Sequence, residues 1–249
     1  MKTYKLLGVK IDSISYDETL EFILSKIKQN RKAKIATVNN EFIVEAQKNH
    51  KFKAVLNKSN LCLPDSTGVV WAIKYLYKEK IERVTGADLT LKLCNLCAQH
   101  DLRIYLLGGR RGVGLMAKNN LMKKFPGIHI VGYNDSIKLS SGIAPASLIT
   151  EINRAKPNII LVALGAPKQE LWIANNFNLL RANIFIGVGG TLDYISGRVK
   201  RAPEIMRKAG LEWLFRLIVQ PSRILRIFRA TIVFPYLVIL SRLKNIVSS

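Results

Sequence analysis

Short apolar runs alternate along this chain with longer segments whose apolar residues recur at helical spacing. Runs that are apolar throughout suit strands covered on both faces, as in a parallel sheet joined by helices. We therefore predict an α/β fold, with a Rossmann-like, mostly parallel sheet flanked by helices. Strands are expected near 34–38, 60–63, 103–107, 128–132, 158–164 and 184–188, and helices over 40–57, 66–78, 88–100, 112–125, 145–155, 168–178 and 191–196. A capping box at Ser15 and Glu18 predicts a further helix beginning there.

Four of the predicted strands end in small or polar residues. Asn39, Asp65, Gly165 and Gly189 stand at or just beyond these ends. Ligands of open parallel sheets bind outside the carboxyl ends of the strands, so these exits should meet at one crevice. Asp65 is then a candidate reactive group, although it could instead cap the helix that begins near Ser66.

A glycine-rich segment, 108–114, follows the predicted strand 103–107 and opens a helix. Glycines there allow backbone amides to approach a phosphate at a helix N-terminus, which makes Gly108 and Gly109 candidate ligands. The segment is not a strict G-x-G-x-x-G, and Asp135 lies beyond the usual ribose-binding spacing. A simple tight turn between strand and helix is an equally good interpretation.

Three other polar residues have both a structural and a functional interpretation. Arg83 could form an ion pair with a neighbouring carboxylate, or bind a phosphate through its planar guanidinium group. Gln169 lies in the first turn of a predicted helix, either as a helix former or facing a ligand. Asp193 could balance a helix dipole or bind ribose hydroxyls.

The sequence changes character after about residue 195, so we predict an α/β domain over 1–195 and a basic helical appendage over 196–249. The appendage holds eleven Lys or Arg residues against two acidic ones, within a chain of formal net charge +22. Such an asymmetry implies an anionic partner, either nucleic acid, acidic lipid or a phosphorylated substrate.

From Ser222 onward, Arg223, Arg226 and Arg229 share one helical face, opposite an apolar one. This pattern is typical of an interfacial membrane helix, and the alternative is a charged face packed on the main domain. No apolar run approaches the ~20 residues that span a bilayer. We expect neither a membrane crossing nor a signal peptide.

The cysteines and histidines suggest no metal centre. Cys62, Cys94 and Cys97 are too few for a disulfide framework, which fits a reducing cytosol. Cys94 and Cys97 form a C-x-x-C without a second ligand pair, so we interpret them as core thiols rather than redox or metal ligands. The three histidines lack metal-like spacing.

A series of blocks together resembles one family, the WecG/TagA/CpsF glycosyltransferases (glycosyltransferase family 26). The blocks follow one another in order from about residue 8 to residue 229. One departure is Ser66, where the family usually has glycine, and a serine fits there if its φ is negative. The matching segments are 37–42, Pro64-Asp65 with 68–70, 82–88, 106–109, 165–170 with Trp172, 188–191 with Ser196-Gly197, 201–203 and 210–214.

The resemblance implies an inverting transfer of an N-acetylmannosamine-type sugar from a UDP donor to N-acetylglucosamine carried on undecaprenyl diphosphate. It implies neither a bound metal nor another cofactor, and an enzyme peripheral on the cytoplasmic face of the membrane. The branch that makes the linkage unit of wall teichoic acid is the expected one. Relatives that serve capsule, exopolysaccharide or common antigen leave other UDP-sugars open.

Inversion needs a base opposite the leaving UDP, and an ordinary Asp with a pKa of ~3.9 is ionised at neutral pH, so Asp65 is assigned this role. Arg83 would stabilise the departing diphosphate. The residues expected to assist are Arg216, Arg223, Arg226, Gly108 and Gly109 at the phosphates, Thr37, Asn39 and Gln169 at the sugar, and Asp193 at the ribose.

Two other function classes remain as alternatives. A nucleic-acid-binding protein would explain the charge, but the aromatic residues of the appendage lie among aliphatic ones rather than arranged for base stacking. A nicotinamide-dependent oxidoreductase would use segment 108–114. We expect no nucleic-acid partner, and the sequence leaves open whether copies of the chain form a homo-oligomer.

Overall fold

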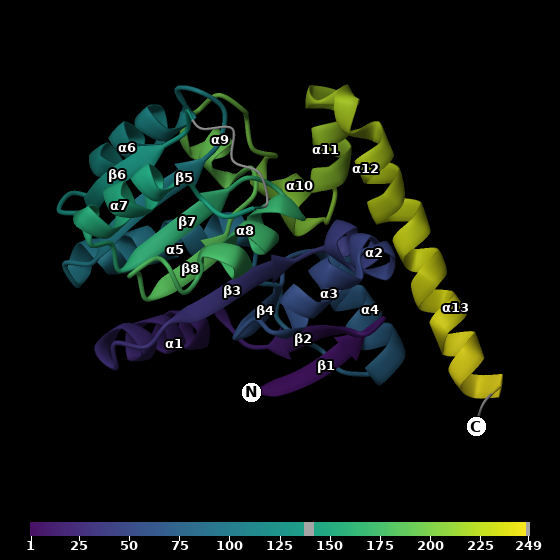
Figure 1. Cartoon of the computed structure of the whole chain (residues 1–249). Coiled ribbons are helices and arrows are strands. Elements are labelled where there is room, and N and C mark those ends of the chain that lie inside the picture. The colour runs from purple at the N-terminus through teal and green to yellow at the C-terminus, as the bar shows by residue number, and fades with distance from the viewer. Residues whose placement is uncertain (137–141, 248–249) are drawn as a thin grey trace.

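The computed structural model describes residues 1–136 and 142–247. Its centre is a six-stranded parallel sheet in the order β4-β3-β8-β7-β5-β6, shown in Figure 1. Each strand lies close to its expected place, so the predicted α/β fold is confirmed. The strands are β3 (Ala33–Val38), β4 (Leu61–Pro64), β5 (Arg103–Gly108), β6 (His129–Asn134), β7 (Ile159–Ala163) and β8 (Ile184–Gly187).

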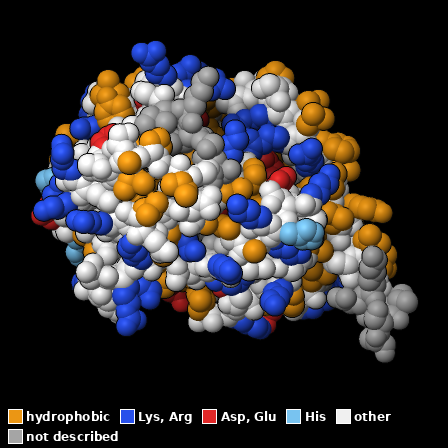
Figure 2. All heavy atoms as spheres, in the orientation of Figure 1, with side chains coloured by type: hydrophobic (Ala, Val, Ile, Leu, Met, Phe, Trp, Pro, Cys, Tyr) orange, Lys and Arg blue, Asp and Glu red, His pale blue; other side chains and the backbone are white. Residues whose placement is uncertain are grey.

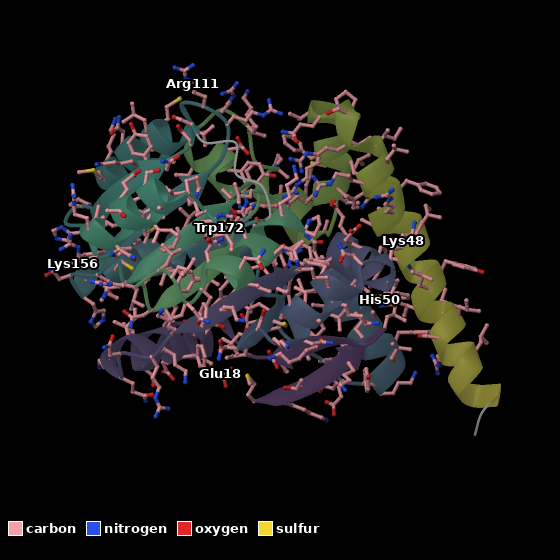
Figure 3. The ribbon with its side chains drawn as sticks, viewed as in Figure 1. Glu18, Lys48, His50, Arg111, Lys156 and Trp172 are labelled. Carbon is pink, nitrogen blue, oxygen red and sulfur yellow. The ribbon has the colours of Figure 1, made fainter. Side chains whose placement is uncertain are left out.

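Helices cover both faces of the sheet because its side chains are apolar on both. Along β5, Ile104 packs into the core on one face and Tyr105 into the core on the other. The first face is covered by α1 (Tyr16–Lys28), α5 (Gly86–Gln99), α6 (Val113–Lys124) and α9 (Thr191–Ile195). The second is covered by α2 (Asn40–Lys48), α3 (His50–Asn57), α4 (Thr67–Tyr77), α7 (Ala146–Ala155) and α8 (Lys168–Asn176). Trp172 of α8 is fully buried near the middle of the molecule, as Figure 3 shows.

The helix starts follow local side-chain chemistry. The capping box predicted at Ser15 and Glu18 is present at the start of α1. The helix expected over 40–57 is instead two helices, since Asn49 ends α2 and its side chain accepts a hydrogen bond from the Phe52 amide. Asparagine favours this N-cap geometry.

An N-terminal hairpin is the element that the sequence analysis missed. Strands β1 (Lys2–Leu6) and β2 (Val9–Ser13) pair in antiparallel register around Leu7 and Gly8, both of which have positive φ. The buried Asp12 carboxylate accepts a 2.8 Å hydrogen bond from the Cys62 amide of β4. The hairpin therefore lies beside β4, at the edge of the sheet, and covers it.

The segment after residue 195 returns to the carboxyl ends of the strands and then runs down the side of the molecule (Figure 1). Phe234 and Val238 are fully buried in the cluster that contains α2 and α4. Just before Pro235, which lacks an amide hydrogen, the helix widens into a π-helical turn. The elements are α10 (Glu204–Lys208), α11 (Glu212–Val219), η1 (Pro221–Arg223), α12 (Ile224–Phe228), η2 (Arg229–Val233) and α13 (Phe234–Val247).

The helical run Pro221–Leu243 is 23 residues long and, by length and composition alone, apolar enough to cross a membrane. This differs from the expectation that no segment reaches such a length. Arginines and Pro235 interrupt the apolar run in the sequence, but they do not interrupt the helix.

The outward side of this helical run is mainly apolar, although Arg229 is also exposed. Figure 2 shows hydrophobic side chains along the outer edge of the molecule, where Figure 1 places α12 and α13. Leu225 is 71% exposed and Phe228 is 53% exposed, so these side chains have little cover from the core. We call the set the apolar stripe, and it consists of Ile224, Leu225, Phe228, Ile232, Tyr236, Ile239 and Leu243.

Candidate active site

A cavity of about 620 Å³ lies between the carboxyl ends of the strands and helices α11 and α12. The exits of β3, β4, β7 and β8 meet there, as the sequence analysis expected of a parallel sheet. Gly108 alone among the eleven residues assigned from the sequence is not part of its lining. The assigned residues that line it are Thr37, Asn39, Asp65, Arg83, Gly109, Gln169, Asp193, Arg216, Arg223 and Arg226.

Asp65 stands directly after β4, and its backbone amide donates to the Val38 carbonyl of the neighbouring strand. Its carboxylate accepts a 2.8 Å hydrogen bond from the Gly86 amide at the start of α5. Ser66, rather than Asp65, caps α4 by accepting from the Val69 amide. The φ of Ser66 is −118°, so the serine satisfies the condition set for replacing the family's glycine.

Burial raises the pKa of the Asp65 carboxyl to about 6, and the nearby Glu212 charge acts in the same direction. The hydrogen bond from Gly86 and the charges of Arg216 and Arg83 act against this rise. Asp65 is therefore mostly ionised at neutral pH, but its pKa is much closer to neutrality than that of an ordinary aspartate. A base with such a pKa transfers protons efficiently near pH 7.

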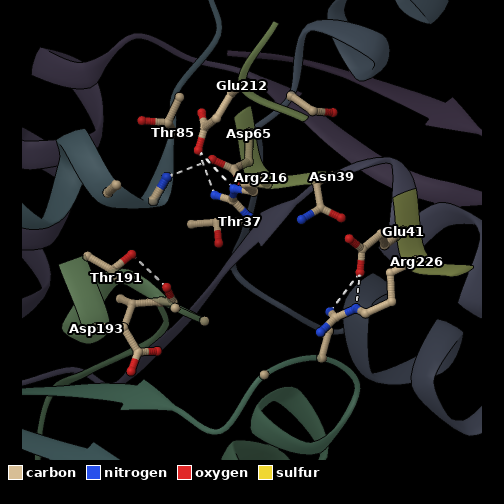
Figure 4. Close-up of a pocket in the computed structure, with 18 of the residues that line it drawn as sticks. Thr37, Asn39, Glu41, Asp65, Thr85, Thr191, Asp193, Glu212, Arg216 and Arg226 are labelled. Carbon is tan, nitrogen blue, oxygen red and sulfur yellow. Dashed lines mark hydrogen bonds and ion pairs between the residues drawn. The ribbon is translucent and has the colours of Figure 1, made fainter. Parts of the chain in front are cut away.

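Four arginines of the appendage line the cavity wall, and within the described part of the chain all but Arg223 are paired with carboxylates. Arg216 lies 2.6 Å from Glu212, and Arg226 lies 2.6 Å from Glu41 of α2 (Figure 4). Among the described residues, no carboxylate pairs with Arg223. Burial lowers the pKa of Arg223, and the charges of Arg216 and Arg226 lower it further. This crowding of guanidinium groups makes the wall suited to an anion.

Arg83 enters the cavity beside Asp65, and its guanidinium donates a 3.2 Å hydrogen bond to the Arg207 carbonyl. The surface pairing with Asp88 that the sequence left open does not occur in the structure. Asp88 instead binds Arg201 through two hydrogen bonds of 2.6 and 2.9 Å. Both contacts attach the segment before α11 to the core.

Gln169 connects two of the strand exits. Its side-chain oxygen accepts hydrogen bonds from the Gly165 amide at 3.1 Å and the Gly189 amide at 2.9 Å. Its side-chain nitrogen donates to Glu170, a buried residue whose pKa burial raises to about 8. The Gln169 amide oxygen is thus already engaged in shaping the cavity, in addition to lining it.

The glycine-rich turn after β5 is tight. Gly108 and Gly109 both have positive φ, and a Cβ on Gly108 would lie 2.8 Å from the Ala163 carbonyl oxygen. The Gly109 amide already donates to this oxygen at 2.9 Å. The geometry therefore supports the interpretation of this segment as a tight strand-to-helix turn. The Gly109 amide, a candidate phosphate ligand, is already hydrogen-bonded within the fold.

The remaining assigned residues differ in whether their side chains already make hydrogen bonds within the protein. Thr37 donates a 3.0 Å hydrogen bond to the Gly187 carbonyl, and Asn39 caps α2. The Asp193 carboxylate makes no side-chain hydrogen bond or ion pair within the described part of the chain, and it lines the cavity. It is the assigned acidic group that is most available for a ligand.

A model of the glycosyl transferase WecG/TagA/CpsF family matches residues 4–247. The chain belongs to this family. It is 35% identical over 196 residues to a Bacillus spizizenii protein named N-acetylglucosaminyldiphosphoundecaprenol N-acetyl-beta-D-mannosaminyltransferase, covering 78% of this chain and 74% of the relative. The protein of that name from Bacillus subtilis strain 168 is 36% identical over 198 residues, covering 79% and 75%. That of Staphylococcus aureus strain MRSA252 is 29% identical over 224 residues, covering 89% and 87%.

The sequence analysis did not single out several side chains that line the cavity of this WecG/TagA/CpsF glycosyltransferase. Glu41 and Arg201 lie within family blocks quoted above, and Glu212 stands four residues before Arg216, at ion-pair spacing on a helix. These signals were available in the sequence. Asp135 was considered only as an acid beyond the usual ribose-binding spacing, and Tyr194 gave no signal, because the folding of separate loops brings them to the cavity.

The described residues contain no group of three or more His, Cys, Asp or Glu side chains that could hold a metal ion. Cys94 and Cys97 are both fully buried in the core, as interpreted from the sequence. Burial raises the pKa of both thiols, which keeps them protonated.

Proposed function

We propose that this glycosyltransferase moves N-acetylmannosamine from UDP to N-acetylglucosaminyl-diphospho-undecaprenol, the acceptor and sugar that the names of its relatives describe for those proteins. The observation that carries this proposal is the cavity itself. The part-buried Asp65 carboxylate, held by the Gly86 amide, lines the same cavity as the arginines of the appendage.

Asp65 acts as the general base. As the acceptor hydroxyl oxygen attacks the anomeric carbon, its proton passes to the Asp65 carboxylate. The bond from the anomeric carbon to the UDP oxygen breaks on the opposite face, and its electron pair leaves on the diphosphate. The configuration at the anomeric carbon is thereby inverted. The hydrogen bond from Gly86 fixes the direction of the carboxylate before the acceptor arrives.

The arginines stabilise the leaving group. Charge develops on the diphosphate as the sugar departs, and fixed cations in a partly desolvated cavity stabilise such charge strongly. Arg223 has its guanidinium available, while Arg216 and Arg226 can exchange a carboxylate for a phosphate. Arg83 lies on the Asp65 side and completes the positive surroundings.

The apolar stripe supports a peripheral location on the membrane that holds the lipid-linked acceptor. Because Arg223 and Arg226 line the cavity, the side of the helix left for a bilayer is mainly apolar, with Arg229 as an exposed arginine of the same run. Helices of this kind bind membrane surfaces by burying their apolar face among the acyl chains. Crossing the membrane instead would remove Phe234 and Val238 from the core.

A panel of UDP-sugars tests the function. Purified protein is given a short-chain lipid-diphosphate-N-acetylglucosamine and, in separate reactions, UDP-linked N-acetylmannosamine, N-acetylglucosamine, glucose or N-acetylmannosaminuronic acid, and UDP release is measured. The highest kcat/KM is expected with N-acetylmannosamine. Preference for another sugar would contradict the donor, and Asp65→Asn, with UDP binding retained, is the inactive control.

A further inference from the structure

Trp213 of α11 is an aromatic residue of the cavity lining whose ring is substantially exposed. Its side chain is 40% exposed. The other aromatic lining residues are less free, since Phe42 is buried and the Arg216 guanidinium lies 5.5 Å from the centre of the Tyr194 ring. Trp213 therefore offers an open indole surface at the cavity, which neither its packing nor the mechanism above uses.

The start of α11, which carries Trp213, lies at the Asp65 end of the cavity. The turn before α11 approaches the loop that carries Asp65, because a Cβ on Gly210 would lie 3.2 Å from the Thr67 side chain. Thr67 is the first residue of α4, two positions after Asp65. Glu212, next to Trp213 in the chain, is close enough for its charge to affect the Asp65 carboxyl. Figure 4 shows Glu212 and Asp65 in the same region of the cavity.

The sugar that must come to this end is the acceptor, because its hydroxyl gives its proton to Asp65. N-acetylglucosamine carries its hydroxyl and acetamido groups equatorially, so its C–H groups form a flat apolar face. Such a face fits an exposed aromatic ring, whose surface is apolar and electron-rich. N-acetylmannosamine fits less well, since its acetamido group is axial and projects from one face.

We propose that Trp213 is the platform on which the acceptor N-acetylglucosamine stacks while Asp65 removes its proton. This proposal rests on the proposed function. Exposed apolar residues flank the platform, with Leu211 at 39% and Ile218 at 71% exposed. The lipid end of the acceptor can therefore remain on this apolar surface while its sugar reaches the cavity. An indole suits such a boundary because it combines an apolar body with a polar N–H.

Kinetics with a water-soluble acceptor test the platform. The acceptor is N-acetylglucosamine diphosphate with a short alkyl chain, so that membrane binding cannot affect the result. Trp213→Ala is expected to raise KM for this acceptor about tenfold, as loss of one aromatic stacking contact predicts, and to leave KM for the UDP-sugar within about twofold. Trp213→Phe, which keeps an aromatic ring, should recover part of the loss. Trp71→Ala is the matched control, since Trp71 is 39% exposed on α4 and outside the cavity lining.

An unchanged acceptor KM in Trp213→Ala, or an equal rise for donor and acceptor, would overturn the platform. Loss of vesicle binding with a normal KM for the soluble acceptor would assign Trp213 to membrane contact and also overturn it. Both readouts are compared with the Trp71→Ala protein, so a general loss of folding is recognised by its effect on all substrates and on the thermal midpoint.

A titration without turnover separates this proposal from the proposed function. In Trp71→Phe protein, the soluble acceptor alone should change the indole emission, and Trp213→Phe in the same background should abolish the change. The buried Trp172 remains as a constant background. An emission change without transfer from any UDP-sugar would contradict the function and keep the platform. Normal transfer without an emission change in Trp71→Phe protein would contradict the platform alone.

Discussion

The carboxylate of Glu41 on α2 binds the guanidinium of Arg226 on α12, with Oε2 2.6 Å from Nη2 and 2.7 Å from Nε. The pair joins the α/β core to the appendage across the cavity. The neighbouring Asn40 donates a 2.8 Å hydrogen bond to the Ala230 carbonyl and so reinforces the same junction. The Glu41 carboxylate thus occupies an arginine that a diphosphate could also bind.

Glu41→Gln should strengthen UDP binding. The pair is partly exposed, and such pairs contribute only ~0–1 kcal/mol, so the thermal midpoint should change little. Removing the competing carboxylate should lower the Kd for UDP up to about fivefold, which calorimetry can measure. Glu21→Gln on the exposed surface of α1 makes the same charge change away from the cavity and should have no effect. Weaker UDP binding in Glu41→Gln would mean that the pair positions Arg226 for the phosphate instead.

Arg223→Ala should weaken UDP binding more than any change at a neighbouring arginine outside the cavity. A hydrogen bond to a charged group contributes ~1.5–3 kcal/mol, so the Kd for UDP should rise about tenfold to a hundredfold. Arg229→Ala is the matched control, because Arg229 lies on the same helical run, is exposed and is not part of the cavity lining. Equal effects of the two substitutions would indicate a general electrostatic attraction rather than a specific contact.

The sheet was predictable from the sequence because strands buried on both faces are apolar throughout, and this pattern depends on nothing outside the segment. The hairpin β1–β2 was missed because apolar and polar residues alternate along its strands, so neither forms a continuous apolar run, although Leu7-Gly8 was an available turn signal. Helical spacing correctly placed Arg223 and Arg226 on one face, but Arg229, expected on the same face, is exposed and does not line the cavity. It could not show whether that face would contact the membrane or the main domain, since the partner carboxylate of Arg226, Glu41, is far away in the chain.

The activity should depend on a group with a pKa near 6. The Asp65 carboxyl must be ionised to accept a proton, and burial raises its pKa to about 6. We expect kcat/KM to be level above neutrality and to fall about tenfold per pH unit below pH ~6. An acidic limb near pH 4 would indicate that Asp65 keeps an ordinary pKa, or that another group acts as the base.

The same shift affects stability in the opposite sense. Between the unfolded pKa near 4 and the folded pKa near 6, the folded protein binds the proton more tightly than the unfolded one. The contribution of Asp65 to the free energy of unfolding therefore falls as pH rises through this window. Asp65→Asn lacks this loss, so its thermal midpoint should rise relative to wild type between pH 4 and pH 6. A constant difference in midpoint would contradict the raised pKa. Glu170 is unchanged in both proteins, so its own titration cancels.

Membrane binding should depend on the apolar stripe rather than on the arginines. Leu225 and Phe228 are more than half exposed and lie on the side of the helix away from the cavity. Replacing both with serine should reduce cosedimentation with phospholipid vesicles at least tenfold, since each large side chain contributes ~1.5–3 kcal/mol when buried in an apolar phase. Turnover of the short-chain soluble acceptor should be retained, because neither residue lines the cavity.

Leu115 and Met116 on α6 provide the matched control for this double substitution. They are exposed apolar residues, at 46% and 48%, on a core helix that is not part of the stripe, so replacing them with serine should leave vesicle binding unchanged. The dependence on salt distinguishes the two possible attractions. Binding through the stripe should persist at 0.5 M salt, where the Debye length falls to ~4 Å and the attraction between exposed lysines or arginines and anionic lipid is largely screened. Loss of binding at high salt, with full binding of the Leu225→Ser/Phe228→Ser protein at low salt, would show that basic residues dock the protein and that the stripe does not.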